Sequence, residues 1–154
     1  MTAPLSFWNL YPLIAALLAL IFGQVLKMIT ATFQSEPFSL KRFFSSGGMP
    51  SSHSAMVASL TTAIGFKEGW LSSPFYIGVI FSLVVLYDAA GIRSAAGKQA
   101  ILLNQLIENL FDKKELKYEK LREMLGHSPF EVGWGVILGC SVAVLLYYSF
   151  IPST

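Results

Sequence analysis

An almost unbroken apolar run from Leu10 to Ile29 is the feature that most limits what this chain can fold into. A helix of about 20 apolar residues is long enough to cross the hydrocarbon core of a bilayer. The rest of the chain agrees, because 54% of its 154 residues are hydrophobic and only 13% are charged, whereas about 25% are charged in ordinary soluble domains. The sequence therefore predicts a membrane protein. No Lys or Arg precedes the run, so we expect a retained span and not a cleaved signal peptide.

Three further apolar runs predict three more membrane helices, and they cover Ser51–Phe66, Pro74–Ala90 and Pro129–Phe150. The run from Ser51 to Phe66 is rich in Ser and Thr, so we expect other helices to shield it from lipid. Between the last two runs, the segment Ala100–Leu125 has apolar residues on one helical face and several basic residues, which is typical of an amphipathic connection outside the hydrocarbon core. The predicted fold is an all-α polytopic membrane bundle of about four helices in one domain, residues 1–154.

Small residues recur at fourth positions in two of these runs. Ala15, Ala19 and Gly23 form one such stripe, and Gly135 with Gly139 forms another. Small residues at this spacing let membrane helices approach closely. Such faces could also pair two copies of the chain, so a homo-oligomer is one expectation. The formal net charge is only +2, which is too small and too scattered to favour nucleic acid as a partner.

The distribution of basic residues predicts the orientation. Lys and Arg follow the first and third spans in number, whereas the opposite face has only Lys67. Cytoplasmic loops carry the excess of positive charge, so both termini should face away from the cytoplasm. Polar and ionisable groups then gather at the cytoplasmic boundary, where such groups are candidates for function, and they comprise Lys27, Arg42, His53, Asp88, Arg93, His127 and Glu131.

The stretch GGMPSSHSAM, Gly47 to Met56, opens the second predicted helix. Ser51 or Ser52 can cap this helix, and the free N–H groups of a helix N-terminus favour an anion. His53 in the first turn would add a proton donor beside a bound phosphate. The alternative interpretation is an ordinary capped helix with a hydrogen-bonded histidine.

His127 is the second histidine, and it stands just before the last span with Glu131 four residues later. A carboxylate one helical turn away can orient an imidazole, as in an activated histidine nucleophile. The alternative is that His127 caps the helix while Glu131 interacts with its positive end.

Together these motifs resemble a known family. Met49-Pro50-Ser51-Ser52-His53 resembles the P-S-G-H motif of the type 2 phosphatidic acid phosphatase and vanadium haloperoxidase superfamily, and His127-Ser128-Pro129-Phe130-Glu131 resembles the end of its third motif. The chain from about residue 8 to residue 148 is similar to the divergent branch described as acid phosphatase/vanadium-dependent haloperoxidase related.

The resemblance implies a phosphatase that forms a phosphohistidine without a metal or other cofactor. The membrane location favours a lipid phosphate as its substrate, and the distribution of basic residues predicts that the site faces the cytoplasm. His127 would attack phosphorus, Glu131 would orient it and His53 would protonate the leaving oxygen. Ser51 and Ser52 would hold phosphate oxygens. We also expect Arg93, positioned by Asp88, to neutralise the phosphate charge, together with Lys27, Arg42 and Lys98.

The chain departs from the superfamily pattern at its cations. Lys27 is not followed by Arg-Pro, since Gln34 stands seven residues later, and Leu121 occupies the place of the third motif's arginine with Arg122 one position away. A non-catalytic protein that binds or transports a lipid phosphate is therefore the main alternative. Two further interpretations are a haloperoxidase and a purely structural protein. A purely structural protein would leave the convergence of the two histidines unexplained.

Overall fold

The computed structural model describes residues 7–33, 48–110, 121 and 126–150, and every regular element in these ranges is helical. The all-α prediction is confirmed. The elements are α1 (Phe7–Phe33), α3 (Ser52–Glu68), α4 (Ser73–Tyr87), the π-helix η1 (Asp88–Ile92), α5 (Arg93–Leu110) and α6 (Pro129–Phe150). The predicted basic residue Arg42 lies outside the described residues.

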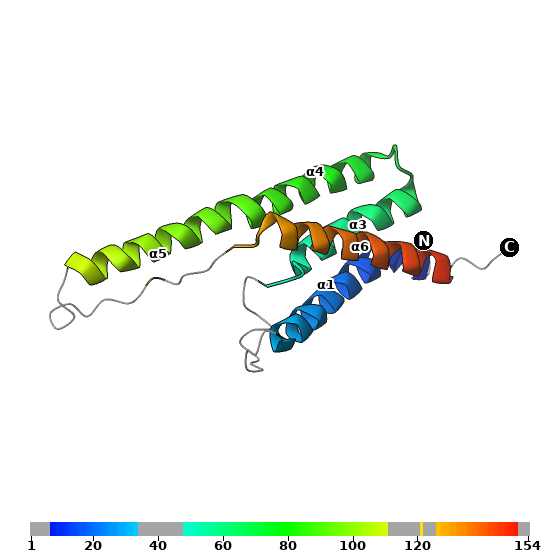
Figure 1. Ribbon diagram of the computed structural model, residues 1–154. Helices are drawn as coiled ribbons and strands as arrows, with labels where there is room; N and C mark the ends of the chain where they lie inside the picture. The colour runs from blue at the N-terminus through cyan, green and yellow to red at the C-terminus, as the bar shows by residue number, and fades with distance from the viewer. Residues whose placement is uncertain (1–6, 34–47, 111–120, 122–125, 151–154) are drawn as a thin grey trace.

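The helices α1, α3, α4 and α6 form the bundle (Figure 1). Three described helices are long and apolar enough to span a membrane, over Phe7–Thr32, Ser73–Asn109 and Pro129–Ser149. The helix α3 is shorter, at 17 residues. Figure 1 shows that α1 begins and α6 ends at the same end of the bundle. Which side of the membrane this end faces stays a prediction.

The helix α3 is the centre of the bundle, because it packs on α1, α4 and α6. Its buried residues are mostly Ser and Ala, and its shielding from lipid is as predicted. A Cβ at Gly23 would lie 2.9 Å from Ser52 Cα, and one at Gly139 would overlap the Ala55 carbonyl oxygen. The small-residue faces are therefore used within the chain, between helices of one copy. A homo-oligomer stays a prediction that needs a different surface.

The third span differs from its prediction. We expected the helix to end near Ala90 and an amphipathic segment to begin at Ala100, but α4, η1 and α5 form one continuous rod (Figure 1). Gly91 does not end the helix, since a single glycine costs only about 1 kcal/mol inside one. At about 1.5 Å per residue, the 37 residues from Ser73 to Asn109 extend well beyond a hydrocarbon core of about 30 Å. The rod must therefore leave the core along its length.

Tyr11 closes the core at the end of the bundle where α1 begins. Its side chain is 1% exposed, and its hydroxyl donates a hydrogen bond of 2.8 Å to the Ala143 carbonyl oxygen of α6. Its ring stacks on Trp8 with centroids 5.5 Å apart. This buried hydrogen bond joins the first and last described helices.

Replacing Tyr11 with phenylalanine should lower the free energy of unfolding by about 1 kcal/mol, because the ring contacts stay while one buried hydrogen bond is lost. Thermal unfolding in detergent measures the effect. Tyr148→Phe is the matched control, since Tyr148 is an exposed residue of α6, and it should leave the unfolding temperature unchanged. Equal stability of the two variants would show that the hydroxyl of Tyr11 does not join the helices.

Candidate functional site

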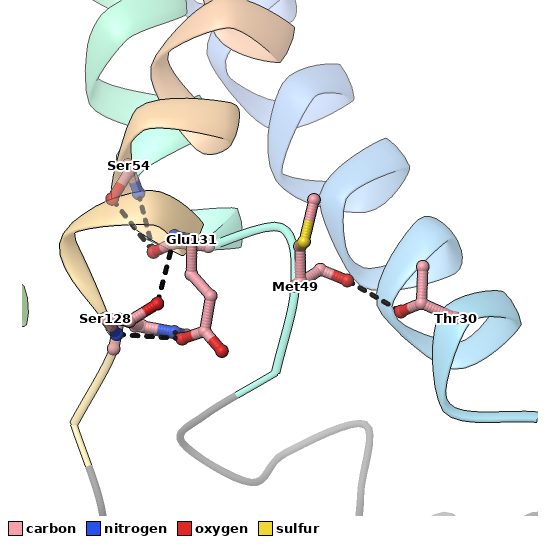
Figure 2. A network of polar contacts seen from close by, with 7 residues as sticks. Thr30, Met49, Ser54, Ser128 and Glu131 are labelled. Atoms are coloured by element: carbon pink, nitrogen blue, oxygen red, sulfur yellow. Dashed lines mark hydrogen bonds and ion pairs between the residues drawn. The ribbon is translucent and has the colours of Figure 1, made fainter. Parts of the chain in front are cut away.

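The loop before α3 is anchored on the end of α1. The Thr30 hydroxyl donates to the Met49 carbonyl oxygen at 2.7 Å (Figure 2). Gly48 has a φ of +92°, a left-handed conformation that favours glycine, and a Cβ there would lie 3.1 Å from Lys27 Cε. Lys27 is only 5% exposed. The predicted cation Lys27 thus lies directly against the motif that opens α3.

Ser51 caps α3, as the sequence predicted. Its Oγ accepts hydrogen bonds from the Ser54 N–H at 3.4 Å and from the Ser54 hydroxyl at 2.8 Å. Its own N–H donates to the Glu131 carbonyl oxygen of α6 at 3.1 Å. Ser51 and Ser52 are both buried. The starts of α3 and α6 are therefore joined, and the role of both serines toward a phosphate stays a prediction.

The start of α6 is a capping box. The Ser128 hydroxyl accepts from the Glu131 N–H at 3.3 Å, and Glu131 Oε2 accepts from the Ser128 N–H at 3.0 Å (Figure 2). Such reciprocal bonds satisfy two free donors at a helix start. The alternative that His127 caps the helix is wrong, because Ser128 is the cap. Its second part is confirmed, because Glu131 interacts with the helix start through the Ser128 N–H. His127 is left for another role.

His127 is fixed by two contacts. Its Nδ1 lies 3.1 Å from Glu131 Oε2, and its backbone N–H donates to the Ala89 carbonyl oxygen of η1 at 3.1 Å. A carboxylate acceptor at Nδ1 favours the tautomer that carries its proton there. The lone pair is then on Nε2, which is the nitrogen able to act as a nucleophile or to receive a proton. The residue is 8% exposed.

Arg93 is paired with Asp88, as predicted. The Arg93 Nε lies 2.7 Å from Asp88 Oδ2, and the arginine side chain is 60% exposed. This pair holds a mostly exposed guanidinium at the junction between η1 and α5. A guanidinium is suited to bind phosphate through several donors at once.

His53 lies in the first turn of α3, which is not one of the three candidate spans. Burial lowers the pKa of His53, and Arg93, His127 when its ring is protonated, and Lys27 lower it further. A bound phosphate would oppose them and raise this pKa again.

Two predicted cations remain to be placed. Lys98 is exposed on α5, beyond the junction at which Arg93 lies, and Arg42 is outside the described residues. Leu121, which stands where the superfamily motif has arginine, is held by its backbone. Its carbonyl oxygen accepts from the Asn104 side-chain amide at 2.9 Å, and its N–H donates to the Asn104 side-chain oxygen at 3.1 Å. Within the described part of the chain, no cluster of three or more His, Cys, Asp or Glu side chains could hold a metal ion.

Sequence reasoning missed three residues that shape the site. The role of Ser128 as a helix cap could have been predicted, because Ser-x-x-Glu before an apolar run is the pattern of a capping box. Ala89 and Gly126 gave no signal. Ala89 contributes a backbone carbonyl, and a Cβ at Gly126 would overlap the Ser94 nitrogen and lie 2.8 Å from the Arg93 carbonyl carbon.

Comparison with known proteins now gives the family. The family model of the Divergent PAP2 family matches residues 8–142. The chain belongs to this family. It is also 37% identical over 151 residues to the Bacillus subtilis (strain 168) protein named "Uncharacterized membrane protein YuiD", and the match covers 91% of this chain and 96% of that one. No solved structure matches.

Membership of the Divergent PAP2 family agrees with the resemblance seen in the two histidine motifs, and both motifs lie within the matched residues. The name of the Bacillus relative describes a membrane protein, which agrees with the three candidate spans. The candidate spans and the family membership therefore support an integral membrane protein that is related to phosphatases.

Proposed function

We propose that this chain is an integral membrane phosphatase that hydrolyses a lipid phosphate monoester through a phosphohistidine at His127. The observation that carries the proposal is the 3.1 Å contact between His127 Nδ1 and Glu131 Oε2. It favours a lone pair on Nε2 and supplies a negative charge beside the imidazole. Both are required of a histidine that attacks phosphorus and becomes positively charged.

In the proposed reaction, Nε2 of His127 forms a bond to phosphorus while the bond from phosphorus to the ester oxygen breaks. His53, protonated in the presence of the substrate, gives its proton to the leaving oxygen. Neutral His53 then takes a proton from a water that attacks phosphohistidine, and this step releases inorganic phosphate and His127. Arg93 stabilises the charge that spreads over the phosphate oxygens.

A lipid substrate is supported by the surroundings of the site. Phe130 and Trp134 lie on the first turns of α6, both are exposed, and their rings meet edge to face with centroids 6.1 Å apart. Exposed aromatic side chains near the end of a spanning helix are typical of the membrane interface. Glu131 lies between them in the sequence, so the site is expected at the depth of lipid headgroups.

Phosphate release from a panel of lipid phosphates tests the proposal. The purified protein in detergent is given long-chain and short-chain alkyl phosphate monoesters, with Glu131→Gln as a variant that keeps the shape of the side chain and removes its charge. We expect release from the long-chain esters, and a lower kcat in the variant. A wild-type rate no higher than that of the protein-free control on every ester would overturn the enzyme.

The role of His53 as an acid gives a sharper expectation. His53→Ala should slow hydrolysis of an alkyl phosphate much more than that of an aryl phosphate, because an aryl oxygen leaves without a proton. An effect of about 10²-fold on the alkyl ester is typical of a lost general acid. The measured quantity is the ratio of kcat/KM values for the two esters. An equal loss on both would rule out this acid.

The second candidate function is binding or transport of a lipid phosphate without hydrolysis. The Arg93–Asp88 pair favours it, since a guanidinium already neutralised by a carboxylate stabilises added charge less than a free one. Binding of a lipid phosphate by a protein that releases no phosphate would establish this alternative.

A further inference from the structure

The π-helix η1 interrupts the rod between α4 and α5 at the site. The Arg93 N–H donates to the Asp88 carbonyl oxygen five residues earlier, instead of the four of an α-helix. Such widened turns are rare, and they are frequent at functional sites. Here the widened turn lies between the two residues of the Arg93–Asp88 pair.

The pair depends on this turn. On an α-helix with 3.6 residues per turn, residues five apart point in directions about 140° apart, and neighbouring side chains are those three or four apart. A turn with bonds between residues five apart returns Arg93 to the side of Asp88. The 2.7 Å contact between their side chains is the result.

The same turn receives the segment that carries His127. The Ala89 carbonyl oxygen of η1 accepts the His127 N–H at 3.1 Å, a donor from outside the helix. Gly126 allows this approach, because a Cβ there would overlap the Ser94 nitrogen and lie 2.9 Å from Ser94 Cα. The backbone of residues 126 and 127 therefore lies directly on the junction of η1 and α5.

We propose that η1 is the positioning element of the site: one widened turn aims Arg93 and also holds the backbone of His127. Gly126 and Ala89 are its positioning residues. The structural consequence stands on the geometry alone, whereas the catalytic consequence rests on the proposed function. Restoring an α-helical turn by removing one residue should return the Ala89 carbonyl oxygen to a hydrogen bond within the helix and so release His127. Arg93 would then lie four residues after Asp88 and would remain its neighbour.

Deletion of Ala90 tests the proposal, because it removes one residue from the widened turn. Deletion of Gln99 is the matched control: it rotates only the later part of α5, including Asn104, and leaves η1 unchanged. The Gln99 deletion turns Asn104 away from Leu121 by about 100°, whereas the Ala90 deletion keeps the direction of α5, so a rise confined to the Ala90 deletion reports η1. The readout is the rate at which diethyl pyrocarbonate modifies His127, relative to N-acetylhistidine in the same tube. The chain has 2 histidines, so mass spectrometry separates them.

We expect modification of His127 to rise severalfold when Ala90 is deleted, because a buried ring loses its anchor, and to stay unchanged when Gln99 is deleted. Gly126→Ala provides a second test that leaves the rod intact. Its control is Gly133→Ala, since a Cβ at Gly133 meets nothing within 4 Å. Gly126→Ala should raise the modification of His127 and lower kcat by about 10²-fold with KM little changed, as expected when a reacting group moves by about 1 Å.

The labelling result is independent of hydrolysis. Unchanged modification of His127 in the Ala90 deletion and in Gly126→Ala overturns the positioning role, whatever the activity. Raised modification of His127 in a protein that hydrolyses none of the lipid phosphates supports the positioning role and overturns the proposed function. If the Ala90 deletion does not unfold cooperatively in detergent, Gly126→Ala against Gly133→Ala decides the question.

Discussion

Replacing His127 with alanine should abolish phosphate release from a lipid phosphate while leaving most of its binding. The substitution removes the only atom proposed to bond to phosphorus, and a loss of at least about a thousandfold in kcat is expected for a missing nucleophile. Arg93, the start of α3 and Lys27 remain to bind the phosphate. The measurements are phosphate release and equilibrium binding of the same lipid phosphate.

Ser128→Ala is the control for this result. It removes the hydroxyl that accepts the Glu131 N–H and keeps both side chains of the His127–Glu131 pair. A lost cap costs about 1 kcal/mol of stability, and turnover should be largely kept. Phosphate release by His127→Ala at the wild-type rate would contradict the proposed mechanism, and an equal loss in Ser128→Ala would assign the effect to the helix cap.

Replacing Gly139 with alanine should cause the largest loss of stability among single methyl additions in the bundle. Its Cβ would overlap the Ala55 carbonyl oxygen and lie 2.9 Å from the Ser59 nitrogen. These are backbone atoms of α3, which cannot move aside as a flexible side chain can. Overpacking of this kind costs about 1–3 kcal/mol, and here it should separate α6 from α3. Thermal or denaturant unfolding in detergent measures it.

Gly133→Ala is again the matched control, since it adds the same methyl group to the same helix where there is open space. It should be neutral or slightly stabilising, because alanine favours a helix over glycine by about 1 kcal/mol. The Gly139 variant should also lose activity, since the hydrogen bond from Ser51 to Glu131 requires α3 and α6 to stay in register. Wild-type stability of Gly139→Ala would refute this packing of α3 on α6.

The membrane class and the four helices of the bundle could be predicted because they depend on local composition. The runs at Leu10–Ile29 and Pro129–Phe150 fall within α1 and α6, and length with hydrophobicity is sufficient to find such spans. The small-residue stripes were recognised as close-packing faces, but their partner was not. Spacing shows that a face can approach another helix, and it does not say whether that helix belongs to the same chain.

The side-chain pairs within the site also differ in how far the sequence explains them. His127 with Glu131 was predictable, because residues four apart at a helix start are neighbours. Asp88 and Arg93 were predicted to pair as residues one turn apart. On an α-helix, however, residues five apart do not face each other. The pair exists because the turn is a π-helix, and nothing in the sequence DAAGI distinguishes that turn from an α-helical one.

By itself, the sequence determined that this chain enters a membrane as helices, where those helices approach closely, and which histidine carries a carboxylate one turn away. All of these follow from hydrophobic length and from spacings within a single helix. Only the tertiary structure decided that α3 is the hub, that its start is bonded to the start of α6, and that the Ala89 carbonyl holds His127. These contacts join backbone atoms far apart in the chain, and backbone atoms are the same at every residue, so no side-chain pattern records them.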